Sequence, residues 1–198
     1  MSHNTWIHRG VRIVLVKPLA KTPVTPNQVT VARIATGLAA AAALAMGDPL
    51  WSTWGAGLFV LSILMDRADG DLARLTGKTS PLGHTLDLIS DASCNTLIFV
   101  GLGLGLRGGG YGLWAIAMGI VAGASVGVIL WRVMQIEETQ GARAAELGSY
   151  AGFDPDDAML AVPLMILLGG SEPLLLAAFI GAPAFAVFFF LFTGRRLS

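Results

Sequence analysis

Long apolar blocks alternate with short polar joints along this chain. Six of these blocks approach the roughly 20 residues that a helix needs to cross a bilayer core, and they predict six spanning helices. Their approximate ranges are 27–46, 51–75, 82–106, 111–135, 157–170 and 173–193. Proline and glycine mark the joints, as in Gly47-Asp48-Pro49. The pattern therefore predicts an all-α integral membrane protein with six transmembrane helices.

A shorter mixed segment precedes the first apolar block. Residues 5–18 combine apolar and basic side chains and are too short to span a bilayer. They predict an N-terminal amphipathic helix that lies at the membrane interface. We expect one domain over residues 1–198, with a cytoplasmic or interfacial arm over 1–24 and a six-helix core over 27–193.

Composition supports a membrane protein and narrows its partners. The chain has 198 residues, of which 54% are hydrophobic and 13% are charged, whereas a typical soluble domain has about 25% charged residues. Its mean hydropathy is +0.68. The formal net charge of +0 gives no electrostatic footprint for nucleic acid. The single cysteine, Cys94, excludes an intramolecular disulfide.

The basic residues predict how the chain is oriented. Of the 13 lysines and arginines, all except Arg107 fall on one side of the predicted spans. The positive-inside rule places that side in the cytoplasm, together with both termini. We expect a bacterial-type inner or plasma membrane, with the site described next at its cytoplasmic face.

Two neighbouring predicted helices carry carboxylates at helical spacing. On the second, positions i, i+3, i+4, i+7 and i+8 are Asp66, Asp69, Gly70, Ala73 and Arg74. On the third, positions i, i+4 and i+8 are Gly83, Asp87 and Asp91. Each set lies on one helix face, and the turn at 76–81 makes the two helices antiparallel neighbours. Because ionisable groups at membrane depth are costly, this cluster of four carboxylates marks a functional site.

The cluster predicts a metal site. Four carboxylates at short range need a countercharge, and two divalent cations would supply it. Oxygen ligands favour Mg²⁺, Mn²⁺ or Ca²⁺ over zinc, and paired metals suit in-line displacement at phosphorus. The alternative is a solvated turn in which Asp side chains pair with Arg67, Arg74 and Lys78. The full spacing on two adjacent spans disfavours that alternative.

The motif Asp-x2-Asp-Gly-x2-Ala-Arg-x8-Gly-x3-Asp-x3-Asp resembles the signature of the CDP-alcohol phosphotransferases, or phosphatidyltransferases. Its fixed positions are Asp66, Asp69, Gly70, Ala73, Arg74, Gly83, Asp87 and Asp91. The resemblance implies transfer of a phosphate-linked group, commonly phosphatidyl from CDP-diacylglycerol, to an acceptor hydroxyl. CMP is released, and the product belongs to phospholipid biosynthesis. The resemblance also implies a homodimer and two Mg²⁺ or Mn²⁺ ions, with Ca²⁺ as a non-productive occupant.

The same resemblance assigns roles to residues. The metal ligands would be Asp66, Asp69, Asp87 and Asp91. Asp91 would also be the catalytic base that deprotonates the acceptor. The nucleotide would be bound by Asn27, Thr30, Asp69, Gly70, Ala73, Arg74 and Gly83.

The acceptor is predicted less narrowly. Arg33, Arg132 and Arg143 are candidates to bind it, and their convergence would suit a phosphorylated polyol such as glycerol 3-phosphate or inositol phosphate. Arg132 interrupts an apolar run, so it either faces protein or extends to the interface. Zwitterionic and uncharged acceptors stay open.

Two other functions share some of these features. A Mg²⁺-dependent membrane prenyltransferase also uses Asp-rich helices, but its two motifs lie much further apart in sequence. A non-enzymatic membrane protein that binds divalent cations would need the carboxylates and no cytidine nucleotide. Metal-coupled binding of CDP or CMP distinguishes the first function from this last one.

Overall fold

The computed structural model describes residues 6–140 and 159–197, and these residues form helices without strands. Three short elements come first: α1 (Trp6–Val11), the π-helix η1 (Arg12–Val16) and α2 (Lys17–Leu19). The long helices are α3 (Pro26–Ala45), α4 (Pro49–Thr76), α5 (Pro81–Gly105), α6 (Trp114–Gln140) and α8 (Ser171–Leu197). The short elements η2 (Leu106–Gly108) and α7 (Ala161–Leu167) complete the described part. The predicted all-α class is confirmed for these residues.

The first three long helices begin with the same local signal. Each starts at a proline, whose missing N–H needs no partner in a first turn, and follows a residue with a capping oxygen. The pairs are Thr25-Pro26, Asp48-Pro49 and Ser80-Pro81. Thr25 forms a capping box with Gln28, in which each side chain accepts from the other residue's backbone N–H. These starts are therefore determined by local sequence.

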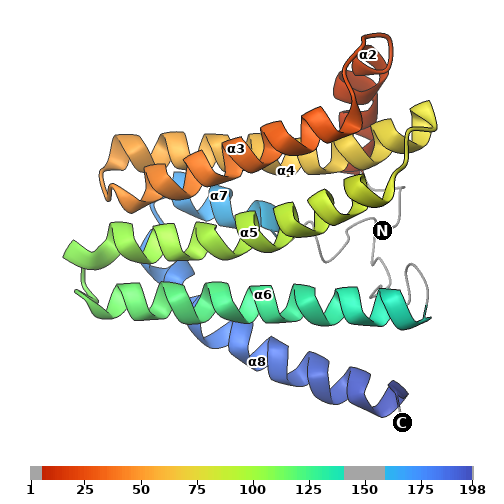
Figure 1. The fold of residues 1–198 in the computed structure, drawn as a ribbon. Coiled ribbons are helices and arrows are strands. Elements are labelled where there is room, and N and C mark those ends of the chain that lie inside the picture. Colours follow the sequence, from red (N-terminus) through yellow and green to blue (C-terminus); the bar gives the residue numbers. More distant parts are fainter. Residues whose placement is uncertain (1–5, 141–158, 198) are drawn as a thin grey trace.

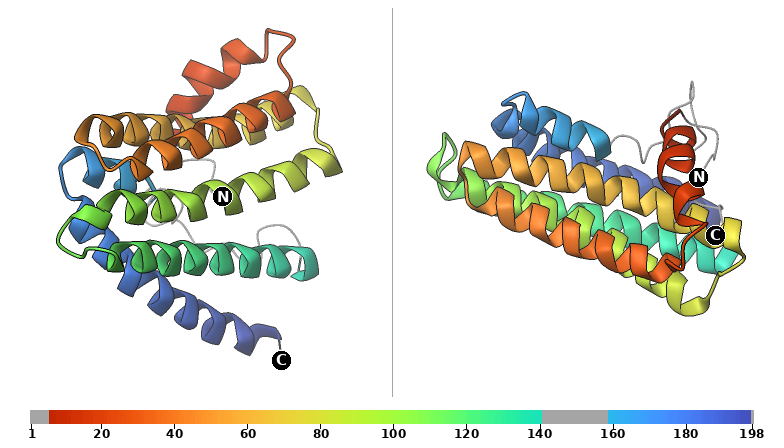
Figure 2. Two further views of the ribbon diagram at one scale, coloured as in Figure 1. Left: turned by 60° about the vertical axis from the view of Figure 1, so that its left-hand side comes forward. Right: turned by 90° about the horizontal axis from the view of Figure 1, so that it is seen from above.

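The helices form an extended array rather than a closed ring. Figure 1 shows α3 and α4 side by side, followed by α5, α6 and α8 in turn, and Figure 2 shows the same order from two other directions. Helix α7 packs against α4. The N-terminal helices, the turn between α4 and α5, and the C-terminal end of α8 lie at the same end of the array. Helix α3 packs against both α4 and α5, and α6 packs against α8. The two carboxylate-bearing helices, expected from the sequence to be direct neighbours, are therefore joined mainly through α3.

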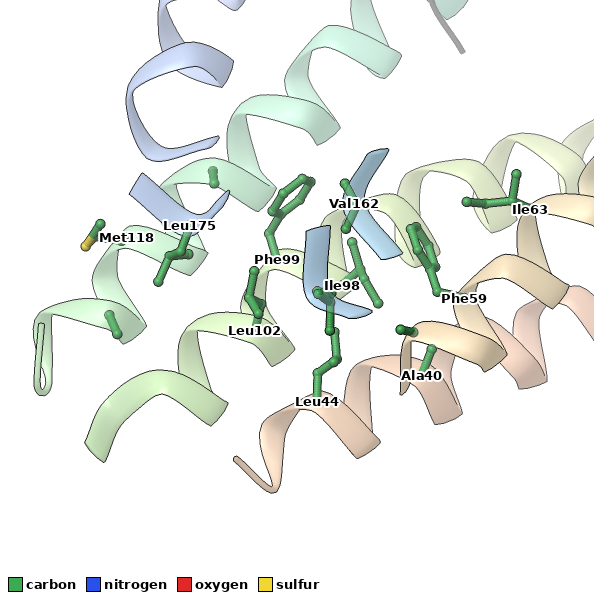
Figure 3. Close-up of a cluster of buried hydrophobic side chains, with 14 residues drawn as sticks. Ala40, Leu44, Phe59, Ile63, Ile98, Phe99, Leu102, Met118, Val162 and Leu175 are labelled. Atoms are coloured by element: carbon green, nitrogen blue, oxygen red, sulfur yellow. The ribbon is translucent and has the colours of Figure 1, made fainter. Parts of the chain in front are cut away.

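The apolar core lies in the half of the array away from the α4–α5 turn. Its side chains come from the C-terminal half of α3, the first half and middle of α4 and the C-terminal half of α5, together with residues of α6, α7 and α8 such as Met118, Val162 and Leu175 (Figure 3). Leu44, Phe59 and Ile98 are at most 2% exposed. Many large apolar side chains on the outer faces are exposed, such as Leu191 at 68%, as expected of surfaces that contact lipid. The core leaves the other half of α3, α4 and α5 for polar residues.

Glycines let α5 approach its neighbours closely. A Cβ atom added at Gly101 would collide with the backbone of Ala41 on α3, and one at Gly103 would collide with the backbone of Ala115 on α6. Small residues at such contacts are typical of membrane helices.

We expect Gly101→Ala to destabilise the protein by about 1–3 kcal/mol through overpacking. Thermal unfolding in detergent measures this effect. Gly57→Ala is the matched control, because nothing lies within 4 Å of its added Cβ, and an equal loss in both variants would contradict the prediction.

Four helices are long and apolar enough to cross a membrane. They are Pro26–Ala45, Pro81–Gly108, Trp114–Glu137 and Ser171–Gly194. Helix α4 has sufficient length at 28 residues but is more polar, with five charged side chains between residues 66 and 74. Helix α7 has seven residues, and part of the predicted span 157–170 lies outside the described residues. The predicted count of six spans is therefore not confirmed.

The N-terminal arm is helical and packs onto the carboxylate-bearing half of the molecule. Val11 and Val16 are buried in a small cluster with Val29 of α3 and with Ala68 and Leu72 of α4. Ala68 and Leu72 are variable positions inside the motif that begins at Asp66. The N-terminal arm thus packs against the apolar face of the α4 segment that carries the carboxylates. Its position at a membrane surface stays a prediction.

Candidate active site

Helices α4 and α5 bring three carboxylates together beside their turn. Helix α4 ends at Gly77, whose left-handed φ of 67° lets the chain turn, and α5 begins four residues later. One carboxylate oxygen each from Asp66, Asp69 and Asp87 lies within 4.8 Å of the other two. The sequence spacing predicted this convergence, and the structure places the oxygens close enough to bind one ion.

Asp91 lies one helical turn beyond Asp87 and outside this group of three. Its Oδ1 accepts a hydrogen bond of 2.5 Å from Nη2 of Arg33. The Asp91 side chain is 23% exposed, so the carboxylate is accessible from one side. Asp91 therefore shares Arg33 with Asp66 and Asp87 without joining the group of three.

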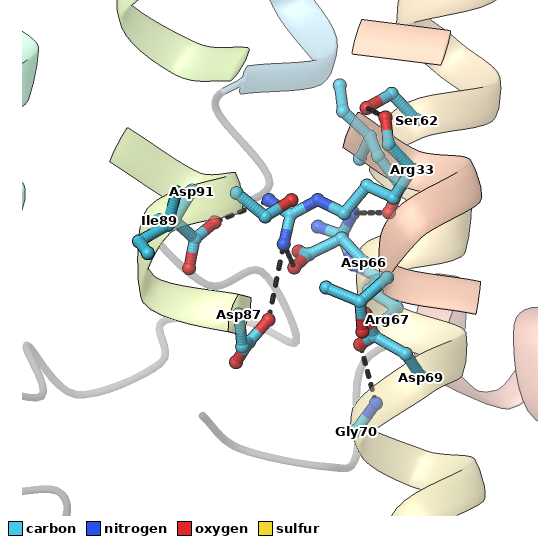
Figure 4. A network of polar contacts seen from close by, with 12 residues as sticks. Arg33, Ser62, Asp66, Arg67, Asp69, Gly70, Asp87, Ile89 and Asp91 are labelled. Atoms are coloured by element: carbon cyan, nitrogen blue, oxygen red, sulfur yellow. Dashed lines mark hydrogen bonds and ion pairs between the residues drawn. The ribbon is translucent and has the colours of Figure 1, made fainter. Parts of the chain in front are cut away.

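Arg33 of α3 enters the carboxylate cluster between the two acidic helices (Figure 4). Its Nη1 lies 2.5 Å from Oδ1 of Asp66 and 3.2 Å from Oδ1 of Asp87. With the bond to Asp91, one guanidinium contacts three carboxylates. The Arg33 side chain is 3% exposed, and it joins α3 to both α4 and α5.

Thr30 positions the remaining carboxylate. It lies three residues before Arg33 and therefore on the same face of α3. Its hydroxyl donates a hydrogen bond of 2.7 Å to Oδ2 of Asp69, and the Gly70 N–H donates to Oδ1 of Asp69 at 2.6 Å. Asp69 is 3% exposed. One turn of α3 thus contacts all four acids of the motif.

The predicted nucleotide-binding residues line the same region. Asn27 lies close to Gly83, because a Cβ atom on Gly83 would be 2.9 Å from Asn27 Oδ1. The Arg74 guanidinium lies beside Gly70. It also donates to Asp71 at 2.8 Å, and its side chain is 51% exposed. Ala73 is half-buried in the same stretch of α4.

The three arginines proposed for the acceptor have different environments. Arg33 belongs to the carboxylate cluster. Arg132 of α6 donates to Thr193 of α8 and to Gln135, each at 3.3 Å, and its guanidinium lies 5.2 Å from the centre of the Phe190 ring. Of the two alternatives for Arg132, the structure therefore favours contact with protein. Arg143 lies outside the described residues.

Sequence reasoning missed the contacts of Thr30 and Arg33 with the acids. The motif itself names no partner on another helix, so the sequence predicts a nucleotide contact for Thr30 and an acceptor contact for Arg33. The signal present in the sequence is an arginine within an otherwise apolar helix, three residues after a threonine. A charge at that depth requires a partner, and the nearby acids were the available ones.

Comparison with known proteins gives the family. The family model described as CDP-alcohol phosphatidyltransferase matches residues 23–192, which are most of the chain. The chain belongs to the CDP-alcohol phosphatidyltransferase family. Members of this family transfer phosphate-linked groups from CDP-alcohols, so the resemblance read from the motif is confirmed.

A curated relative agrees with this assignment. The Bifunctional IPC transferase and DIPP synthase of Rubrobacter xylanophilus is 36% identical over 87 residues, which are 44% of this chain and 19% of that protein. The chain therefore spans only a small part of the length of this relative. Both proteins fall within the CDP-alcohol phosphatidyltransferase family.

Divalent ions, which the family uses, fit the residues of this site. The ligands available are carboxylate oxygens, the donors that Mg²⁺ and Mn²⁺ prefer. Arg33 balances one of the four acids of the motif, and its Nε is buried without a hydrogen-bond partner. The cluster thus holds more negative charge than Arg33 compensates. Asp66, Asp69 and Asp87 are the residues best placed to hold an ion.

Proposed function

We propose that this protein transfers a phosphatidyl group from a CDP-alcohol such as CDP-diacylglycerol to an acceptor hydroxyl and releases CMP. The observation that carries the proposal is the grouping of Asp66 and Asp69 of α4 with Asp87 of α5, whose oxygens lie within 4.8 Å of one another. Family membership supports the CDP-alcohol donor. The apolar surfaces of the four candidate spans support a donor that is a lipid.

The proposed reaction is a displacement at phosphorus. The acceptor oxygen forms a bond to the β-phosphorus of the CDP-alcohol, and the bond from that phosphorus to the oxygen bridging to CMP breaks. CMP leaves with the bridging oxygen. Two divalent ions, when bound, supply neutralisation of the phosphate charge and activation of the hydroxyl. Mg²⁺ or Mn²⁺ is the proposed cofactor.

The acids of the motif divide the work. Asp66, Asp69 and Asp87 are the main ligands of the ions, while Asp91 ligates or lies beside a metal and takes the proton from the acceptor hydroxyl as general base. The position of Asp91 outside the group of three supports this division. A base must reach the acceptor, whereas a metal ligand must reach its fellow ligands.

The nucleotide would lie along the start of α3 and the end of α4. Asn27, Gly70 and Gly83 offer close backbone approach and an amide, and Ala73 adds a small half-buried surface. Arg74 is exposed beside Gly70 and is suited to contact phosphate oxygens. Thr30 and Asp69, which are hydrogen-bonded to each other, complete the proposed set of nucleotide-binding residues.

Arg132 and Arg143 are proposed to attract a phosphorylated polyol to the carboxylate site. Because Arg132 contacts Thr193 and Gln135 of the described residues, it would act from the α6–α8 side. We propose that the site opens to the cytoplasm, as the distribution of basic residues predicts, and that the protein is a homodimer like other members of its family.

Purified full-length protein tests the function directly. With Mn²⁺ or Mg²⁺ and CDP-diacylglycerol, we expect CMP release only when a suitable acceptor is added, and a panel of phosphorylated and uncharged alcohols identifies it. Absence of CMP release and of lipid product across the panel would contradict phosphatidyl transfer. Incubation with prenyl diphosphates under the same conditions tests the prenyltransferase alternative.

A binding experiment separates catalysis from simple cation binding. CDP and CMP are titrated into the protein with and without Mn²⁺. The proposed function requires nucleotide binding that strengthens when the metal is present. Metal binding without any response to cytidine nucleotides would favour the non-enzymatic alternative.

A further inference from the structure

The Arg33 guanidinium contacts the same carboxylates that a divalent ion would need. It contacts Oδ1 of Asp66 at 2.5 Å and Oδ1 of Asp87 at 3.2 Å, and both residues belong to the group of three carboxylates whose oxygens lie within 4.8 Å of one another. Coulomb repulsion between a guanidinium and a divalent ion is large at such separations. Arg33 and a bound ion therefore compete for the same acids.

One nitrogen of the Arg33 guanidinium group is buried without a hydrogen bond. Nη1 and Nη2 have acidic partners, whereas Nε is buried without a hydrogen-bond partner, in a side chain that is 3% exposed. A buried donor without a partner is destabilising. The guanidinium thus gains ion pairs with three acids at the expense of one donor, which identifies the carboxylates as the reason for its position.

We propose that Arg33 is a built-in counter-cation that keeps the carboxylate cluster assembled without metal and gives up Asp66 and Asp87 when divalent ions bind. This inference rests on the proposed function, in which these acids are metal ligands. It goes further by assigning Arg33 a defined role, which is to oppose metal binding and to stabilise the metal-free state.

The placement of Arg33 on a third helix suits this role. Asp66 belongs to α4, and Asp87 and Asp91 belong to α5, so the acids of these two helices repel each other where their side chains converge. Arg33 reaches both helices from α3 and links the facing acids. Removing its charge should lower the stability of the metal-free protein and at the same time raise its affinity for the metal. A purely structural arginine would not have these two opposite effects.

Titration of Mn²⁺ into the detergent-solubilised full chain tests the proposal, with free Mn²⁺ followed by electron paramagnetic resonance. We expect Arg33→Gln to bind Mn²⁺ about tenfold more tightly than the wild type, because competition and repulsion are both removed. Its unfolding temperature without metal should be lower, and the rise on adding Mn²⁺ should be larger. Arg107→Gln is the matched control, since Arg107 donates to the backbone carbonyls of Ala45 and Leu104 and is not part of the carboxylate cluster. Its Mn²⁺ affinity should equal that of the wild type.

Arg33→Lys is the second variant and decides the question if the glutamine variant does not fold. An ammonium keeps the charge but lacks the fork that contacts three acids, so we expect about threefold tighter Mn²⁺ binding than in the wild type. Unchanged or weaker Mn²⁺ binding in the variants, while the wild type binds Mn²⁺, would overturn the role of Arg33 alone. A wild type that binds no Mn²⁺ would overturn the metal site of the proposed function as well.

Discussion

Asp91→Asn is expected to lower CMP release by about 10²- to 10⁴-fold, which is the usual contribution of a general base. The asparagine side chain has nearly the same shape but cannot take the proton from the acceptor hydroxyl. Mn²⁺ affinity should stay close to that of the wild type, because the group of three carboxylates consists of Asp66, Asp69 and Asp87. Initial rates of CMP release, measured with saturating donor and acceptor, give the size of the effect.

This pair of measurements makes the role of Asp91 falsifiable. Undiminished turnover in Asp91→Asn would exclude Asp91 as the base. A loss of Mn²⁺ binding equal to the loss of turnover would instead make Asp91 a metal ligand. Because Asp91 also accepts from Arg33 at 2.5 Å, the unfolding temperature of the variant must be recorded beside its activity.

Asp66→Asn is expected to weaken Mn²⁺ binding at least about 100-fold and to reduce phosphatidyl transfer below detection. Mutation of a residue that merely orients a metal ligand costs about 10- to 100-fold in affinity, and loss of a ligand should cost no less. Asp66 is also the partner of Arg33 Nη1 at 2.5 Å. The variant therefore loses one negative charge while Arg33 remains, and both changes oppose binding of a cation.

Asp71→Asn is the matched control for this experiment. Asp71 lies on the same helix five residues later and pairs with Arg74 at 2.8 Å, outside the group that could hold a metal. We expect its Mn²⁺ affinity to be within about threefold of the wild type. Comparable losses in the Asp66 and Asp71 variants would indicate a general charge effect and would contradict a specific metal site.

Much of the fold could be predicted because its signals are local. A capping residue before proline determines where α3, α4 and α5 start, and Gly77 ends α4. Helical spacing placed Asp66 and Asp69 on one face and Asp87 on the next helix. The family resemblance rested on the same short motif and was confirmed by a match over residues 23–192. The count of six spans was harder to predict, because charged residues make α4 more polar than a typical span.

The sequence by itself determined which residues share a helix face and that four acids gather at one turn. Only the tertiary structure decided which residues of α3 meet them. Arg33 reaches Asp87 and Asp91 across 54 and 58 residues, and Thr30 reaches Asp69 across 39. Helical periodicity fixes the direction of a side chain within its own helix, whereas the partner across an interface depends on how close glycines let the helices approach. Helix packing therefore places Arg33 among the acids of the motif, where it contacts Asp66, Asp87 and Asp91.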